Sequence, residues 1–213
     1  MDLPYQLSIT KEQLKELPVA MFPGEITVVE TPEQEEEAFA RLSQYDTVGF
    51  DTETRPSFRK GKVNNVSLIQ VSTDDHCFLF RINKLGFTSA IRRFMENGAI
   101  LKIGLSLKDD FNVLHRNSDF APDGFIDLQQ FVKEYAIRDL ALSKIYGIIF
   151  DQRISKSQRL SNWEAPVLTE GQQIYASIDA WACLRIYNRL RSGEFHPEDS
   201  PYRYVPEDPE QHA

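Results

Sequence analysis

Two acidic residues follow an apolar run at strand spacing in residues 47–53 (Thr-Val-Gly-Phe-Asp-Thr-Glu), and this pattern constrains the fold most strongly. In a β-strand, residues i and i+2 share a face, so Asp51 and Glu53 project in one direction, about 6.5–7 Å apart at Cα. Carboxylates this close repel each other and take up protons unless a cation lies between them. Ligand sets made only of oxygen suit Mg²⁺ or Mn²⁺. The alternative is a strand that runs out into a polar loop, and the pair alone does not decide between the two.

Length and composition bound the class of protein. A chain of 213 residues is most simply one domain with a full hydrophobic core. An apolar fraction of 41% and a charged fraction of 26% are typical of a soluble globular protein. The net charge of −8 argues against broad, nonspecific binding of polyanions. A nucleic-acid ligand would therefore need a local basic patch or bound metal ions.

The compartment is suggested by the cysteines and by the absence of targeting patterns. Cys77 and Cys183 lack metal-ligand spacing and lie in apolar runs, so we expect buried free thiols in a reducing compartment. The sequence starts without a basic segment followed by an apolar one, and no run approaches the roughly 18 apolar residues of a membrane-spanning helix. We therefore expect a cytoplasmic protein without membrane contact; its oligomeric state stays open.

The hydrophobic periodicity predicts an α/β fold with a mixed central sheet flanked by helices. Short turns join strands at 47–53, 65–72 and 76–82, which predicts an antiparallel meander. Helices on either side of a further strand supply crossover connections and so predict parallel neighbours. The remaining predicted elements are strands at 25–30 and 99–103 and helices that begin at 32 or span 88–97, 106–116, 127–135, 139–147 and 169–192.

We expect three parts along the chain. Residues 1–24 form an N-terminal extension, in which Thr10 and Gln13 have the spacing of a helix capping box. Residues 25–193 form the folded domain. Residues 194–213 are rich in Pro, Glu and Asp and are expected to form a loose C-terminal tail.

Further acidic residues fall on two predicted helices. Tyr175 and Asp179 are four residues apart on the last helix and therefore lie on one face. Ser106 is a natural N-cap, which places Asp109 and Asp110 in the first turns of a helix, where the helix dipole favours negative charge. Each acid alone is equally explained as a polar helix edge or a helix start. Their order along the chain carries more information.

Asp-x-Glu at a strand end, an Asp early in a mid-chain helix and Tyr-x-x-x-Asp on the last helix occur here in that order. With this order the chain resembles the DEDD superfamily of 3′–5′ exonucleases, in the subtype with tyrosine (DEDDy). The resemblance is closest to ribonuclease D and Werner-type exonuclease domains and covers roughly residues 25–191. The matching segments are 50–53, 66–70, 102–114, 160–163, 168–170 and 175–180. In the third of these, the spacing from Gly104 selects Asp110 over Asp109.

The resemblance implies a ribonuclease H-like fold, with residues 25–193 as the exonuclease domain. It also implies hydrolysis of phosphodiester bonds at the 3′ end of DNA or RNA with two Mg²⁺ or Mn²⁺ ions. Asp51 would bridge both ions, and Glu53 and Asp179 would complete the first metal site. Asp110 would hold the second ion through water, and Tyr175 would orient or help to deprotonate the attacking water.

Basic side chains beside these segments are candidates for guiding the nucleic-acid strand, although a solvated surface charge explains each equally well. The candidates are Arg55, Arg59, Lys60, Lys62, Lys156 and Arg159. Phe58 is expected in the core, with stacking on a base as the alternative. Trp163 is expected to pack beneath the last helix.

Two other functions stay open on the sequence. One is a catalytically inactive ribonuclease H-like module that binds nucleic acid or a partner protein. The presence of all five residues implied in catalysis argues against it. The other is a small-nucleotide hydrolase that uses the same acids in a narrow pocket.

Overall fold

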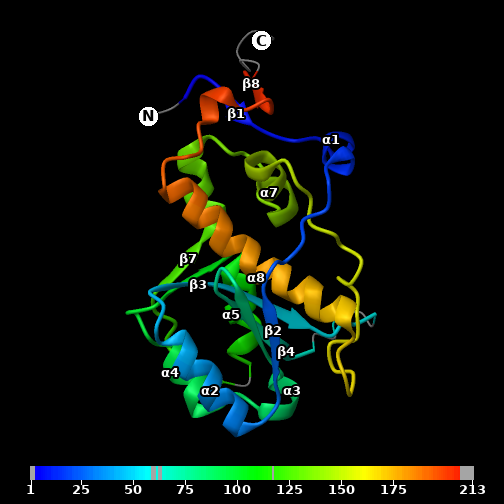
Figure 1. Ribbon diagram of the computed structural model, residues 1–213, viewed down its shortest axis with the longest axis vertical. Helices are drawn as coiled ribbons and strands as arrows, with labels where there is room; N and C mark the ends of the chain where they lie inside the picture. Colours follow the sequence, from blue (N-terminus) through cyan, green and yellow to red (C-terminus); the bar gives the residue numbers. More distant parts are fainter. Residues whose placement is uncertain (1–2, 59–60, 62–63, 117, 207–213) are drawn as a thin grey trace.

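The computed structural model describes residues 3–58, 61, 64–116 and 118–206 (Figure 1). Its main sheet has six strands in the order β2-β5-β4-β3-β6-β7. These strands are β2 (Glu25–Val29), β3 (Thr47–Thr54), β4 (Val66–Ser72), β5 (His76–Phe80), β6 (Leu101–Gly104) and β7 (Phe125–Asp127). The helices are α1 (Lys11–Glu16), α2 (Pro32–Leu42), α3 (Ile82–Leu85), α4 (Ser89–Met95), α5 (Leu107–Leu114), α6 (Leu128–Phe131), α7 (Leu142–Phe150) and α8 (Glu170–Arg191), with short 3-10 helices η1 (Val132–Tyr135) and η2 (Pro197–Asp199).

The pairing confirms the predicted mixed sheet. β3, β4 and β5 form an antiparallel meander, while β6 lies parallel to β3 and β7 lies parallel to β6. β2 joins the far edge parallel to β5. β7, which has three residues, was not predicted, and its last residue, Asp127, is the first residue of the predicted helix 127–135. This strand places Asp127 beside Gly104, at the ends of neighbouring strands.

Helices cover both faces of the sheet. Successive residues of β3 face opposite sides, so they contact different helices. Val48 and Phe50 are fully buried and share a hydrophobic cluster with residues of α2, α4 and α5. Gly49, between them, faces α8 on the opposite side. α8 runs diagonally across the middle of the molecule and contacts β3, β4, β5 and β6 (Figure 1). A capping box of Thr169 and Gln172 begins this helix, which confirms the predicted capping box.

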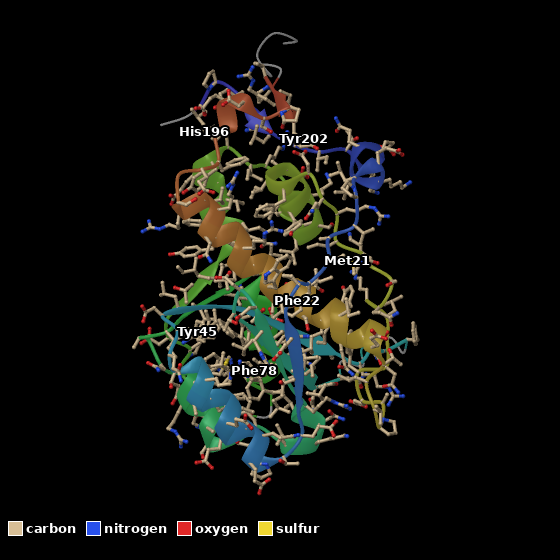
Figure 2. The ribbon with its side chains drawn as sticks, in the orientation of Figure 1. Met21, Phe22, Tyr45, Phe78, His196 and Tyr202 are labelled. Carbon is tan, nitrogen blue, oxygen red and sulfur yellow. The ribbon has the colours of Figure 1, made fainter. Side chains whose placement is uncertain are left out.

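The segment after α8 differs from the expected loose tail. β1 (Gln6–Leu7) pairs antiparallel with β8 (Arg203–Tyr204), and the two strands lie together at one end of the molecule (Figure 1). Tyr202, labelled in Figure 2, is buried and its hydroxyl donates to Asp151 Oδ1 at 2.7 Å. The expectation of a loose tail is therefore wrong for residues 197–204, because a strand pairing and a buried aromatic ring fix them.

The N-terminal residues also belong to the packed core. Leu7 and Ile9 are fully buried in the hydrophobic cluster that includes α7 and α8. The Ile9 amide and the Ser8 hydroxyl both donate to Asp139 Oδ2, at 2.9 and 2.8 Å. Farther along, Phe22 lies beside α8 and packs edge-on against Trp181 (Figure 2). The expected capping box of Thr10 and Gln13 is present at α1.

Gly49 allows α8 to approach β3 closely. A methyl group at this position would lie 1.9 Å from the Ala180 carbonyl oxygen, which is far inside van der Waals contact. Since Asp179 is the neighbour of Ala180 on α8 and Asp51 lies two residues after Gly49 on the same face of β3, this approach also sets the distance between their carboxylates.

We expect Gly49→Ala to destabilise the fold by at least about 1–3 kcal/mol, because α8 must move away from the sheet. Urea unfolding measures the loss. Gly171→Ala on the same helix is the matched control, since its added methyl group would come no closer than 3.5 Å to Gln158. This control should be neutral or slightly stabilising, because alanine favours helix more than glycine does. Equal stability of the two variants would contradict the close-approach argument.

Candidate active site

Three carboxylates from two elements meet at the end of β3. Asp51 and Glu53 project from the face of β3 that α8 covers, and Asp179 projects from α8 toward them. One oxygen of each of the three side chains lies within 4.8 Å of the other two. The structure thus brings together the acids that the sequence analysis assigned to a first metal site.

Asp110 approaches this group from α5. The hydroxyl of Thr52, the residue between Asp51 and Glu53 on β3, donates a hydrogen bond to Asp110 Oδ1, and the charge of Asp110 raises the pKa of both neighbouring acids. Asp110 is half-buried, whereas Asp109 is exposed and accepts a hydrogen bond from Ser106 Oγ at 3.4 Å. The structure therefore separates the two neighbouring acids, with Asp110 on the side of the cluster.

The predicted cap of α5 is wrong. Ser106 adopts a left-handed conformation with φ 63°, and its side chain makes no capping hydrogen bond. The backbone amides of Ser106 and Leu107 donate instead to the carboxylate of Asp127. Asp127 was not predicted as a cap because its strand is too short to show a period. The signal in the sequence is an Asp that directly precedes a helix, which is a common N-cap.

Burial raises the pKa values of all four carboxyl groups, and repulsion by the other clustered acids raises those of Asp51 and Glu53 further. Burial is the largest cause for Asp51, followed by the charges of Asp179, Asp110 and Glu53. Burial and the charges of Asp179 and Asp110 raise the pKa of Glu53 to about 9. The pKa of Asp110 and that of Asp179 are each raised to about 7, mainly by burial, against the opposing effects of Thr52 and Tyr175.

These shifts test whether the cluster fits a divalent cation. A buried group of like charges costs free energy unless protons or a metal ion neutralise it. The donor atoms are all carboxylate oxygens, which is the ligand type of hard cations such as Mg²⁺ and Mn²⁺. The residues therefore fit a divalent metal ion in both charge and chemistry.

Tyr175 lies next to the cluster on α8. Its hydroxyl donates to the Asp179 carboxylate, one turn farther along the helix, and burial with the charges of Asp179 and Glu53 raises its pKa. Trp163 is fully buried beneath it, with ring centroids 6.1 Å apart, as expected for a packing residue. The tyrosine is therefore a neutral hydrogen-bonding group beside the acids.

A cleft of about 330 Å³ opens onto Asp51, Tyr175 and Asp179. Its other lining residues include the apolar side chains of Leu105, Leu142 and Ile154 and the basic side chains of Lys156 and Arg159. Lys156 lowers the pKa of Asp179 and Arg159 lowers that of Glu53, which places both cations near the acids. The cleft thus combines a carboxylate floor with a cationic rim.

The other basic residues predicted to bind the strand do not line this cleft in the described part of the chain. Arg55 forms an ion pair with Glu164, with Nη1 3.0 Å from Oε2, and so ties the end of β3 to the loop before α8. Arg59, Lys60 and Lys62 lie outside the described residues. Phe58 is 87% exposed, so its expected place in the core is wrong.

A buried arginine that the sequence analysis overlooked holds the same loop. Arg81 is fully buried and donates to Glu30 Oε1 at 3.0 Å and to the Ala165 carbonyl at 2.5 Å. Lys84 donates to the same Glu30 oxygen and to the Pro166 carbonyl, at 2.7 and 2.8 Å. The signal in the sequence is a charged residue directly after the apolar strand 76–80.

The mixed sheet, the helices on both faces and the carboxylate cluster define a nuclease-type site on a ribonuclease H-like fold, of the kind that uses divalent metal ions. A sequence model described as 3′-5′ exonuclease matches residues 26–193. The chain belongs to this 3′–5′ exonuclease family, which confirms the predicted resemblance at the level of the family.

Individual relatives support this assignment. The bifunctional 3′-5′ exonuclease/ATP-dependent helicase WRN of Mus musculus is 32% identical over 184 residues, which cover 82% of this chain and 13% of WRN. RNase D of Escherichia coli has the same fold, with a TM-score of 0.70 at 21% identity over 78% of this chain and 44% of that one. RNase D of Trypanosoma brucei in complex with RNA U12 has a TM-score of 0.70 at 20% identity, over 79% and 63% of the two chains. The chain thus spans only part of these relatives.

Within the described part of the chain, no helix combines the length and the apolar character needed to cross a membrane.

Proposed function

We propose that this chain is a metal-dependent 3′–5′ exonuclease of the DEDDy type that hydrolyses phosphodiester bonds at the 3′ end of DNA or RNA. The observation that carries the proposal is the convergence of Asp51, Glu53 and Asp179 beside a cleft that Asp51, Asp179 and Tyr175 line. Residues 25–193 are the proposed exonuclease domain. Two free buried thiols, Cys77 and Cys183, support a reducing compartment, and we place the activity in the cytoplasm.

The four acids would hold two Mg²⁺ or Mn²⁺ ions. Asp51 has the central position, because Glu53, Asp110 and Asp179 all raise its pKa. In our proposal Asp51 would serve both ions, Glu53 and Asp179 would complete the first site, and Asp110 would hold the second ion. When bound, the ions supply a water molecule of lowered pKa and relieve charge on the attacking and leaving oxygens.

Tyr175 and the cationic rim have separate proposed tasks. The hydroxyl of Tyr175 is within hydrogen-bonding reach of Asp179. In our proposal it would form a hydrogen bond with the attacking water beside that carboxylate. Lys156 and Arg159 line the cleft and would bind phosphate oxygens of the strand. Two basic side chains and two divalent ions would offset locally the net charge of −8.

The substrate is a nucleic acid with a free 3′ end. The mouse relative joins an exonuclease to a helicase, and the trypanosomal neighbour was solved with RNA U12. The neighbour supports RNA, and the proposal keeps DNA as the second polymer. An inactive binding module and a small-nucleotide hydrolase are the outcomes that would replace it.

Digestion of end-labelled oligonucleotides tests the proposal. DNA and RNA strands labelled at the 3′ or at the 5′ end are incubated with Mg²⁺, with Mn²⁺ and with chelator. We expect shortening from the 3′ end that requires metal, and the comparison of strands separates DNA from RNA. If folded, metal-bound protein cleaves neither polymer, the proposal fails; cleavage of free dinucleotides alone would indicate the small-nucleotide hydrolase.

A further inference from the structure

One carboxylate organises the starts of two helices next to the cluster. Asp127 Oδ1 accepts hydrogen bonds from the amides of Ser106 and Gln129, at 3.1 and 2.9 Å, and Oδ2 accepts from the Leu107 amide at 3.0 Å. Asp127 is the N-cap of α6 by its own position in the chain, and it caps α5 from the neighbouring strand. Three backbone amides thus converge on its two oxygens.

α5 depends on this external cap. Ser106 in its left-handed conformation presents no side-chain acceptor to the helix, and the first amides of a helix have no partner within it. The parallel register of β6 and β7 sets Asp127 opposite Gly104, two residues before Ser106. The direction in which α5 leaves the sheet is therefore tied to β7 through these hydrogen bonds.

Asp110 is the residue that this direction controls. It lies three residues after Leu107, so about 4.5 Å along the helix and nearly one turn farther round. Its other anchor is the Thr52 hydroxyl on β3. With Asp127 at the helix start and Thr52 at the carboxylate, Asp110 is fixed at both ends relative to Asp51.

The need for an acid at this position comes from the backbone amides that it caps, and not from the neighbouring acids. The charge of Asp127 adds repulsion to Asp110, which is already crowded by other acids. A carboxylate nevertheless offers two oxygens that only accept, whereas an asparagine offers one oxygen and an amide group that would face a backbone amide. Three converging N–H donors therefore select Asp despite the added repulsion.

We propose that Asp127 is a positioning residue that caps α5 from β7 and thereby fixes Asp110 for the second metal ion. The inference rests on the proposed function, because it takes Asp110 as a ligand of that ion. Asp127 does not line the cleft, so it acts through the helix and not on the substrate.

Calorimetric titration with Mn²⁺ alone, together with thermal unfolding, tests the inference on the full chain. Asp127→Ala is expected to weaken one of two Mn²⁺ affinities by about 10–100-fold and to leave the other within about twofold. Asp127→Asn keeps one acceptor oxygen and should fall between this variant and the wild type. If Asp127→Ala does not fold, the Mn²⁺ affinities of Asp127→Asn test the inference.

Thr88→Ala is the matched control. Thr88 caps α4 by accepting from the Ile91 amide at 3.1 Å, and α4 carries none of the clustered acids. This variant should lower the melting temperature to a similar extent without changing either Mn²⁺ affinity. If Asp127→Asn and Thr88→Ala both lose stability and both keep the two wild-type affinities, Asp127 is only a structural cap and the inference is overturned. If the wild type itself binds no Mn²⁺ or cleaves no strand, the proposed function fails first, so the two failures are distinguishable.

Discussion

Asp51→Asn is expected to lower 3′–5′ exonuclease turnover by at least about 10³-fold, equivalent to about 4 kcal/mol of lost transition-state stabilisation. In the proposed site this carboxylate is the ligand shared by both metal ions. Its amide replacement keeps the size of the side chain and removes one charge from the cluster. Gel-based digestion of a 5′-labelled strand under single-turnover conditions measures the rate.

The same substitution should raise the melting temperature in chelator. Glu53, Asp110 and Asp179 repel the Asp51 carboxylate, and burial raises its pKa further, so a neutral side chain relieves unfavourable charge. A variant that is inactive but more stable without metal cannot owe its inactivity to unfolding. Asp109→Asn is the control, because Asp109 is the exposed neighbour of Asp110. An Asp51→Asn enzyme with wild-type turnover would show that the site is assigned wrongly.

The sequence predicted those parts of the fold that have local signals. The β3–β5 meander has alternating residues and short turns, and the capping boxes at Thr10 and Thr169 mark where α1 and α8 begin. The acids of the cluster were predicted together because the order of their motifs matches a family. Their i, i+2 and i, i+4 spacings require only that β3 and α8 form as predicted.

The features that were missed depend on contacts between distant segments. β1 and β8 have two residues each and are separated by almost the whole chain, so no local period announces their pairing. The helix predicted at 139–147 begins at Leu142 instead, because Asp139 is occupied by the Ser8 hydroxyl and the Ile9 amide. Asp127 replaced Ser106 as the cap of α5 for the same reason: a residue on another strand competed successfully with the local one.

Metal binding should become more stabilising as the pH rises. The folded-state pKa of Glu53 is raised from 4.5 to about 9, and those of Asp110 and Asp179 from 3.8 to about 7. Between these values the folded protein holds more protons than the unfolded chain, so the free energy of unfolding in chelator falls as pH rises from about 4 toward 9. Metal ions replace those protons, and their apparent affinity rises over the same range because the ligands must be deprotonated.

Thermal unfolding at pH 6 and pH 8.5, with chelator and with Mn²⁺, measures this linkage. An ion present at about 100 times its dissociation constant stabilises by about 2.7 kcal/mol, or roughly 5–11 °C for a chain of this size. We expect a shift of this order at pH 8.5 and a smaller one at pH 6. Burial lowers the pKa of Lys102 to about 8, so its loss of a proton raises the free energy of unfolding as the pH rises through 8. In the wild type this partly masks the fall in stability that the carboxylates cause in chelator. Asp51→Asn retains Lys102, so the difference between the two proteins isolates the carboxylates. A Mn²⁺ shift in the wild type that is the same at both pH values, or one that Asp51→Asn retains in full, would show that the ion binds elsewhere.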